Sequence, residues 1–285
     1  MTPDEFKALL ADHKPGDTIT LTGEIPGLLR PKGALLEGIT LDARKAKIGT
    51  LYPGGGVAGL TILGGTWAGV RLDGVTSLRV YKAAFEGPEL ADGYGLFVNG
   101  GADVAVAEAS FTNYKTGAVL SKVDGFHIRA SAFARMRSDG MTIGLSRMGE
   151  IYDNLFHGTR ITGLEHPDMV QLFSRPTHPP TSDIHIARNR GIGMTQGICG
   201  FNHTRNGVND GGFDRIVITD NDLVCGFPQG ICLSEARDSE VTGNAVRTYP
   251  GARFRASINI VGGSVARSGN TVAAGAGKPA VIDPG

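Results

Sequence analysis

The stretch Gly149-Glu-Ile-Tyr-Asp-Asn-Leu-Phe156 is one copy of an eight-residue pattern that recurs along the chain. Apolar and polar residues alternate within it, and its third residue is apolar and β-branched. Both features are typical of a strand with one buried face. Other copies cover residues 60–67, 78–85, 104–111, 126–133, 184–191, 216–223 and 239–246. Their third residues are Ile62, Val80, Val106, Ile128, Ile151, Ile186, Ile218 and Val241.

The sixth residue of the later copies is always asparagine. Asparagine tolerates the left-handed backbone conformation of a tight turn, and its amide can hydrogen-bond to a backbone group. Because one asparagine recurs in each repeat, we also expect the amides to bond one another along the repeat axis. The series consists of Asn154, Asn189, Asn221, Asn244 and, in a weaker last copy, Asn270.

A second strand-like segment follows each copy and usually opens on glycine, as in Gly95-Leu-Phe-Val-Asn99 and Gly230-Ile-Cys-Leu-Ser234. Two strands therefore recur in the same order with a period of roughly 22 to 35 residues. This period is too short for βαβ units and too regular for a sandwich. Strands that stack turn upon turn in this way predict an all-β parallel solenoid.

The repeat and its asparagine series resemble the right-handed parallel β-helix proteins of the pectate-lyase-like superfamily, over about residues 35–275. The resemblance implies a single-stranded right-handed parallel β-helix. The superfamily includes mannuronan epimerases, polygalacturonases, polysaccharide lyases and phage tailspikes. A shared fold therefore leaves the activity open.

We expect one domain over residues 1–285, with an N-terminal cap at 1–34, rungs at 35–275 and a tail at 276–285. The cap begins with a short amphipathic helix, for which Thr2 is the N-cap residue and Pro3 occupies the first position. Phe6, Leu9 and Leu10 form its apolar face. Such a helix would cover the exposed first rung of the solenoid.

The charge balance, the N-terminal sequence and the cysteine count limit the partners and the location that we expect for this protein. Lys+Arg and Asp+Glu balance at 28 each, which gives no reason to expect nucleic acid or an anionic membrane as partner. The N-terminus does not resemble a secretory signal, so we expect cytoplasmic synthesis followed by release through lysis or association with a virion. The three cysteines do not make a disulfide framework. No acidic cluster suggests a metal, and no cofactor is expected.

The repeat is widened in two consecutive copies. Asn154 to Asn189 spans 35 residues and Asn189 to Asn221 spans 32, whereas the later steps span 23 and 26. The extra residues lie at 157–166, 175–183 and 203–212. Insertions into a solenoid commonly lie on one binding face, and we expect these to build a groove. Histidines and arginines gather in these two widened copies: His157, His166, His178, His185, His203, Arg160, Arg175 and Arg205.

The residue before each second strand forms a file along the solenoid: Ala68, Tyr94, Thr116, Asp139, Asp168, Gln196 and Gln229. Successive rungs lie about 4.8 Å apart, so Asp139 and Asp168 are expected to be neighbours, with Gln196 next. Two carboxylates this close raise the pKa of one of them, as a general acid requires. The short separation favours a nucleophile-and-acid pair. The alternative is that each aspartate only caps a turn.

Two functions fit these features. The first is a depolymerase, either a lyase or a glycoside hydrolase, acting on an acidic or capsular polysaccharide. Its expected catalytic residues are His166, Asp168 and Asp139, and its expected substrate-binding residues are Arg160, Gln171, Gln196, His203 and Arg205. The second is a non-catalytic glycan-binding spike of a phage or phage-like particle, by analogy a homotrimer. The string Glu165-His-Pro-Asp168 resembles the Asp-Pro-His-Asp signature of mannuronan epimerases, but its residue order differs, so their roles are not transferred.

Overall fold

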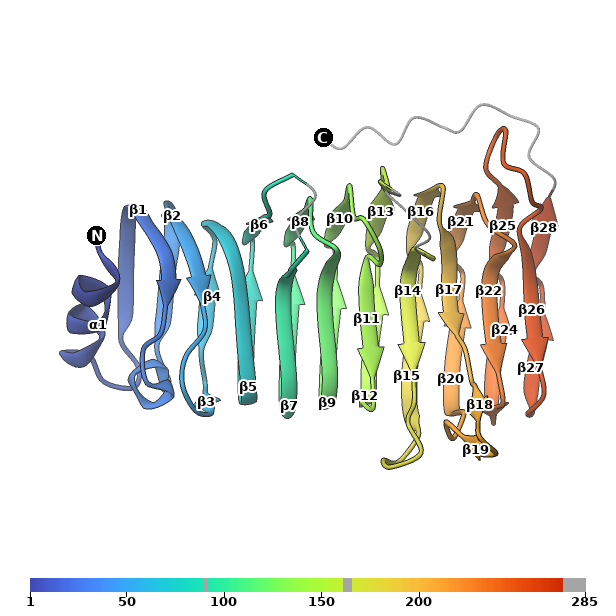
Figure 1. Cartoon of the computed structure of the whole chain (residues 1–285), viewed down its shortest axis with the longest axis horizontal. Coiled ribbons are helices and arrows are strands. Elements are labelled where there is room, and N and C mark those ends of the chain that lie inside the picture. The colour runs from blue at the N-terminus through green and yellow to red at the C-terminus, as the bar shows by residue number, and fades with distance from the viewer. Residues whose placement is uncertain (90–91, 161–165, 274–285) are drawn as a thin grey trace.

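The structure is a computed structural model that describes residues 1–89, 92–160 and 166–273. The chain forms a long coil of parallel strands with α1 (Pro3–Ala11) at its N-terminal end (Figure 1). A capping box starts the helix, because Thr2 Oγ1 accepts the Glu5 N–H and the Glu5 carboxylate accepts the Thr2 N–H. Phe6 and Leu10 are fully buried, and the helix packs against β1 (Thr18–Leu29). The predicted capping helix is confirmed.

Each rung of the coil has three sides. The first side consists of β3 (Val57–Ala58), β4 (Thr61–Leu63), β12 (Arg147–Tyr152), β15 (Thr181–Ala187), β20 (Phe213–Thr219), β23 (Ala236–Arg237), β24 (Ser239–Thr242) and β27 (Val265–Ser268). The second side consists of β6 (Ala84–Glu86), β8 (Ser110–Thr112), β10 (Ala132–Ala134), β13 (Leu155–His157), β16 (Arg190–Gly193), β21 (Asp222–Cys225), β25 (Ala245–Thr248) and β28 (Thr271–Ala273).

The third side consists of β11 (Met141–Gly144), β14 (Asp168–Phe173), β17 (Gln196–Gly200), β22 (Gln229–Ser234) and β26 (Ser257–Val261). Towards the N-terminus, longer strands bend round the corners and belong to more than one side: β1, β2 (Thr40–Leu51), β5 (Thr66–Tyr81), β7 (Tyr94–Ala107) and β9 (Thr116–Arg129). The short helix η1 (Gly33–Leu36) precedes β2. One antiparallel hairpin, β18 (Thr204–Arg205) with β19 (Val208–Asn209), leaves the coil at one edge (Figure 1).

These strands confirm the predicted parallel solenoid but correct its rung. Two strands per repeat were expected, whereas each full rung has three. The eight-residue pattern contains a corner, so that Gly149–Phe156 supplies both the end of β12 and most of β13. The alternation shifts by one residue at this corner, because Tyr152 and Asp153 both face outward between the buried Ile151 and Asn154. The prediction treated all eight residues as one strand and so overlooked the bend that this shift marks. The predicted tail at 276–285 lies outside the described residues.

The asparagine series forms a continuous hydrogen-bonded ladder, as predicted. Asn189 Nδ2 donates to Ile151 O and to Asn221 Oδ1, both at 2.9 Å. Asn189 Oδ1 accepts the backbone N–H and the side-chain amide of Asn154, both at 3.0 Å. The same pattern continues through Asn244 to Asn270. Each inner amide is satisfied on both sides while buried, which fixes the register between rungs.

The expected backbone role of these asparagines is wrong. The left-handed residue at this corner is the one before each asparagine, such as Asp153 with φ 57° and Arg188 with φ 53°. Those side chains are exposed, whereas the asparagines must point inward to reach the neighbouring rungs. One residue makes the turn and the next makes the ladder.

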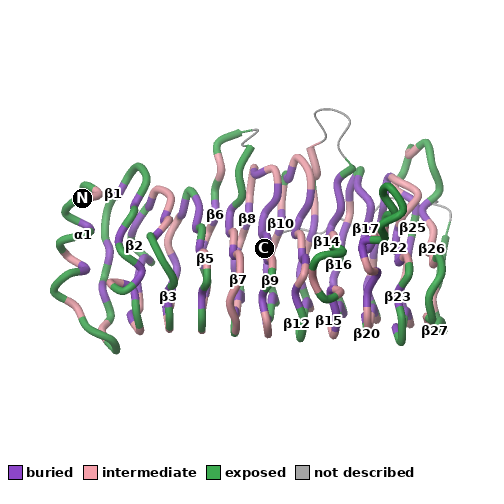
Figure 2. The backbone as a smooth tube through the Cα atoms, turned by 60° about the horizontal axis from the view of Figure 1, so that its bottom comes forward, coloured by how far each residue is buried: buried purple, intermediate pink, exposed green. Residues whose placement is uncertain are grey.

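The core is thin and is repeated rung by rung. The β-branched third residues of the pattern are all buried, and Figure 2 shows buried residues on every turn of the coil. On the second side, Phe85, Phe111, Phe133 and Phe156 stack face to face, with ring centroids 4.7, 4.7 and 5.1 Å apart. Their spacing is the rung spacing, so identical side chains in register build the core.

This phenylalanine stack ends where the repeat widens. Gly191 takes the position that follows Phe156, and a Cβ at Gly191 would lie 2.1 Å from the Sδ atom of Met169. Met169 itself stands where the neighbouring rungs have Gly140 and Gly197. A Cβ at Gly140 would lie 2.5 Å from the Phe156 ring. The core at this rung is therefore filled by Met169 of the third side, directly after Asp168, instead of by a phenylalanine of the second side.

Replacing Asn189 by alanine tests the ladder. The substitution removes the acceptor for two Asn154 donors and leaves Ile151 O and Asn221 Oδ1 each without one donor. Each buried unsatisfied group costs about 1–3 kcal/mol, so we expect the free energy of unfolding in urea to fall by at least about 3 kcal/mol. The matched control is Asn270→Ala at the half-exposed end of the ladder, where water can replace the lost partner. Equal losses in the two variants would show that the ladder does not fix the rungs.

Candidate functional site

Asp139 and Asp168 lie side by side where the third side begins. Met141 is opposite Val170, and Asp168 is opposite Gln196. The Asp168 N–H donates to Asp139 Oδ1 at 3.1 Å. The predicted file is therefore in register, and its two acidic members are neighbours on adjacent strands.

Three members of this file, Asp139, Asp168 and Gln196, each bond a side chain three residues further along the chain. Thr142 Oγ1 donates to Asp139 Oδ2 at 3.0 Å, and Gln171 Nε2 donates to Asp168 Oδ2 at 3.2 Å. One rung further, Cys199 Sγ–H donates to Gln196 Oε1 at 3.3 Å. Three consecutive rungs thus carry the same polar pair on the outer face of the third side.

Both carboxyl groups are buried, with Asp139 7% and Asp168 1% exposed. Burial raises the pKa of Asp139 to about 6. Burial, and then the charge of Asp139, raises the pKa of Asp168 well above its ordinary value. The hydrogen bond from Gln171 offsets this only in part. The expectation that one pKa rises is met by both groups, and desolvation rather than mutual charge is the larger cause.

The two groups differ in what their oxygens contact. Asp139 receives three hydrogen bonds, from Ser138, Thr142 and the Asp168 backbone. Asp168 Oδ1 is buried without a hydrogen-bond partner among the described residues. A charge is costly at such an atom, whereas a neutral acid is tolerated. Asp168 is therefore the member of the pair that holds a proton more readily, and Asp139 is the member that ionises more readily.

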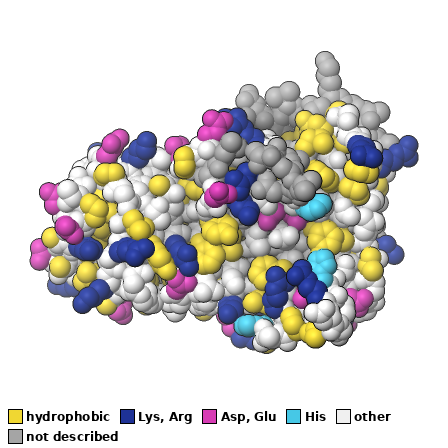
Figure 3. All heavy atoms as spheres, in the orientation of Figure 1, with side chains coloured by type: hydrophobic (Ala, Val, Ile, Leu, Met, Phe, Trp, Pro, Cys, Tyr) yellow, Lys and Arg dark blue, Asp and Glu magenta, His cyan; other side chains and the backbone are white. Residues whose placement is uncertain are grey.

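A pocket of about 280 Å³ opens beside this pair on the outer face of the third side. The residues Gln171, His203 and Arg205, all predicted from the sequence, line it together. Its remaining lining residues are Thr142, Leu172, Phe173, Arg175 and Phe201. Thr142 and Gln171 thus join the pocket to the carboxyl groups. Figure 3 shows basic and histidine side chains gathered on this face over the rungs that follow the middle of the coil.

The sequence reading missed the aromatic part of this pocket. The Arg175 guanidinium lies 5.0 Å from the centre of the Phe173 ring, and the rings of Phe201 and His203 stack at 6.3 Å. Phe173 is the last residue of β14 and Phe201 follows the last residue of β17. They occupy corresponding positions on adjacent rungs, which is the signal that would have identified them.

Other predicted residues lie elsewhere. Arg160 does not line the pocket and instead bonds Glu89, on the loop after β6. His166 is exposed on the segment before β14, and residues 161–165 of the same insertion lie outside the described residues. The histidines of the widened repeats do not gather at one place. His185 contacts Thr219 on the first side, and His178 contacts Thr177.

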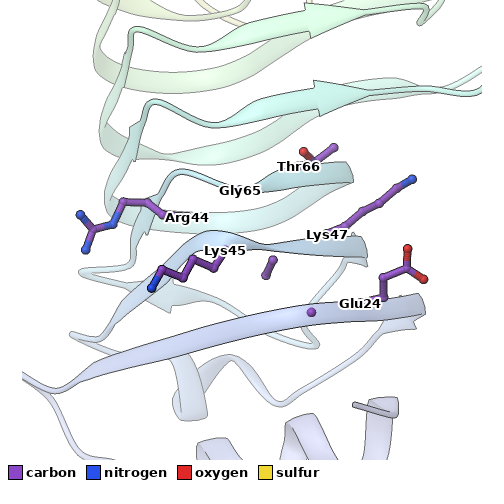
Figure 4. A pocket seen from close by; sticks show the side chains of 8 residues that line it. Glu24, Arg44, Lys45, Lys47, Gly65 and Thr66 are labelled. Carbon is purple, nitrogen blue, oxygen red and sulfur yellow. The ribbon is translucent and has the colours of Figure 1, made fainter.

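A larger hollow of about 480 Å³ lies over the N-terminal rungs. Figure 4 shows that its basic side chains diverge, with Arg44 and Lys45 on one side of the ribbon and Lys47 and Glu24 at the other. Arg44 is also held by both carboxylate oxygens of Asp42. Because its charged groups do not converge, this hollow is a weaker candidate than the smaller pocket.

Within residues 1–89, 92–160 and 166–273, no group of three or more His, Cys, Asp or Glu side chains is arranged to hold a metal ion. No helix in this part of the chain is both long and apolar enough to cross a membrane. The cysteines Cys199, Cys225 and Cys232 are buried and free.

The sequence matches no protein-family model and no curated protein. The structure is similar to solved parallel β-helix proteins. The surface adhesin PfbA of Streptococcus pneumoniae has a TM-score of 0.55 at 10% identity, over 94% of this chain and 87% of the adhesin. The A-module of the mannuronan C-5 epimerase of Azotobacter vinelandii has a TM-score of 0.53 at 11% identity, over 92% of this chain and 90% of the module.

The Dettilon tailspike protein is similar over 94% of this chain, with a TM-score of 0.53 at 12% identity. The chain spans 55% of the length of that tailspike. Likeness at these identities shows the fold, and the function has to be argued from the site.

The raised pKa values predict a pH-dependent cost to folding. In the unfolded chain an aspartate ionises near pH 3.8, whereas Asp139 in the folded protein ionises near pH 6. The Asp139 carboxyl therefore costs no stability below about pH 4, where it is protonated in both the folded and the unfolded chain. Its cost grows as the pH rises and is complete above about pH 6. We expect Asp139→Asn to exceed the wild type in free energy of unfolding by up to about 3 kcal/mol at neutral pH, and by little at pH 4.

The exposed Asp153→Asn substitution is the matched control, since Asp153 pairs with Arg188 at the surface. Its difference from the wild type is expected to vary little over the same pH range. If the Asp139→Asn and wild-type stabilities ran parallel from pH 4 to neutrality, the Asp139 carboxyl would not be the buried, weakened acid described above.

Proposed function

We propose that the chain is a carbohydrate-active protein that depolymerises an acidic polysaccharide in the pocket beside β11, β14 and β17. The observation that carries this proposal is the acid pair. Asp139 and Asp168 are adjacent, have raised pKa values, and are joined through Thr142 and Gln171 to a pocket that contains Arg175 and Arg205. The fold shared with a mannuronan epimerase module and a tailspike supports a glycan as the ligand.

In a hydrolytic reaction, protonated Asp168 donates its proton to the glycosidic oxygen as the sugar bond breaks. Ionised Asp139 attacks the sugar carbon of the breaking bond, or stabilises the positive charge that forms on it. Adjacent parallel strands are about 4.8 Å apart, which is close to the separation of carboxyl groups in retaining glycosidases. The geometry therefore favours a covalent sugar–enzyme intermediate, which water then hydrolyses as the Asp168 carboxylate takes a proton from that water.

In an eliminative reaction, Arg205 and Arg175 would neutralise a uronate carboxylate and so acidify the proton on the adjacent carbon. His166 would then be the base, and Asp168 the acid that protonates the leaving oxygen. Gln171 and His203 would hold sugar hydroxyls in either reaction. Gln196 bonds Cys199 and would act by supporting Asp168 from the next rung.

A second function is favoured by the burial of the acid pair. With Asp168 only 1% exposed, a sugar bond reaches it only if Gln171 moves aside. If Gln171 stays in place, the pocket is a binding site alone, on a non-catalytic glycan-binding spike. For that case we propose display on a phage-like particle as a homotrimer, with His203 and the pocket arginines holding the glycan.

Incubation with a panel of bacterial and algal polysaccharides separates these functions. A rise in the ultraviolet absorbance of unsaturated uronates would identify elimination, and new reducing ends without that absorbance would identify hydrolysis. Binding without either product would support the spike. We expect products from acidic polymers and none from neutral ones.

The roles of the acid pair predict the behaviour of two variants. Asp168→Asn removes the proton donor and Asp139→Asn removes the charge, so each is expected to lower the rate by about 10²–10⁴-fold. The wild-type rate should rise as the pH passes about 6, where Asp139 ionises. The exposed Asp153→Asn variant is the control and should cut at the wild-type rate. Undiminished cutting by both acid-pair variants would place the reaction elsewhere.

A further inference from the structure

A file of side chains in register extends from the pocket toward the N-terminus on the outer face of the third side, and its N-terminal part consists of arginine and aromatic residues. Starting from Gln171, the residues in register on preceding strands are Thr142, Val119, Phe97 and Arg71. Tyr52 and Arg30 continue the file at the ends of β2 and β1, where the Tyr52 N–H bonds Leu29 O. The file thus lies on the same face as the acid pair.

Cation–π contacts hold the N-terminal part of this file together. The Arg71 guanidinium lies 4.7 Å from the centre of the Tyr52 ring and 4.9 Å from that of Phe97. The Arg30 guanidinium lies 5.5 Å from the centre of the same Tyr52 ring. Tyr94 is the first residue of β7, and the centre of its ring lies 5.4 Å from the centre of the Phe97 ring. We call Arg30, Tyr52, Arg71, Tyr94 and Phe97 the aromatic platform.

The platform is accessible to a ligand. Tyr94 is 43% exposed and the Arg71 side chain 50% exposed. Burying such an exposed aromatic ring against a ligand stabilises the complex. Along this face, Figure 3 shows hydrophobic and basic side chains alternating over the N-terminal half of the coil.

A further hollow of about 330 Å³, distinct from the two described above, lies at the N-terminal end of the platform. It is lined in part by Arg30, Lys32, Tyr52 and Asp73. The platform therefore connects two hollows on one face, with Arg30, Lys32 and Arg71 as its cations and Asp73 as the anion next to Arg71, at 3.9 Å. The balance of charge is positive and favours an anionic ligand.

We propose that the aromatic platform binds the extended part of an acidic oligosaccharide whose other end occupies the pocket at Gln171. Sugar rings would lie against Tyr94 and Phe97, and their carboxylate or sulfate groups would pair with Arg71 and Arg30. The rise of about 4.8 Å per rung is similar to the length of one pyranose unit, so that successive sugars meet successive rungs. This inference rests on the proposed function, because it takes the acid pair as the point from which the glycan extends.

The test measures binding on the Asp168→Asn protein, so that no turnover confounds it. The probes are immobilised disaccharides and octasaccharides of mannuronate, galacturonate and hyaluronan, with cello-oligosaccharides as neutral counterparts. The variant is Tyr94→Ala with Phe97→Ala. The matched control is Phe254→Ala, which removes an exposed ring that also contacts an arginine, Arg253, but lies outside the platform.

We expect at least one acidic octasaccharide to bind more tightly than its disaccharide. The double platform variant should lose about tenfold in affinity for that octasaccharide, with no change for the disaccharide, and Phe254→Ala should match its parent. Unchanged octasaccharide affinity in the double variant would overturn the inference, as would equal affinity for neutral octasaccharides. So would sedimentation showing that the double substitution dissociates an oligomer, since the platform would then be an interface between copies.

These outcomes are distinct from those that test the proposed function. Loss of octasaccharide affinity in the double variant, together with no cutting of any polysaccharide by the wild type, would support the platform and reject the depolymerase. Cutting by the wild type with unchanged octasaccharide affinity in the double variant would do the reverse.

Discussion

The constraint on which this structure depends is the exact stacking of one rung on the next, held by the buried asparagine ladder. Each ladder amide bonds a backbone carbonyl in one direction and another amide in the other. A slip of one residue would leave these groups unpaired inside the protein and turn every alternating side chain to the wrong face. Register is therefore fixed over the rungs from Asn154 to Asn270, and residues far apart in sequence become neighbours at defined spacing.

The candidate site is a consequence of that register. Asp139 and Asp168 are 29 residues apart along the chain, and only the stacking of β14 on β11 brings them together. Their burial costs stability, because it weakens both acids. The rung that carries Asp168 also departs from the core pattern, with Met169 filling the space left by Gly191. A local departure from an otherwise regular core beside a costly polar pair is what a functional site typically shows.

Much of this was predictable from the sequence, for a physical reason. Alternation reports which residues face inward, and the recurrence of asparagine reports the period, so the solenoid and the neighbouring aspartates followed directly. The third strand of each rung was not predicted, because the one-residue shift of alternation at the corner, at Tyr152 and Asp153, is too short to stand out within an eight-residue pattern. The pairing of Arg160 with Glu89, 71 residues away, depends on loop geometry that no local pattern encodes. Phe173 and Phe201 were missed because they lie just where the strands end.

The most direct measurement of the central claim is the protonation state of the acid pair, read from the infrared carbonyl stretch of protonated carboxyl groups. The account predicts such a band at neutral pH in the wild type, its loss in Asp168→Asn, and its retention in Asp139→Asn. Absence of the band at neutral pH in the wild type, or its survival in Asp168→Asn, would contradict the account.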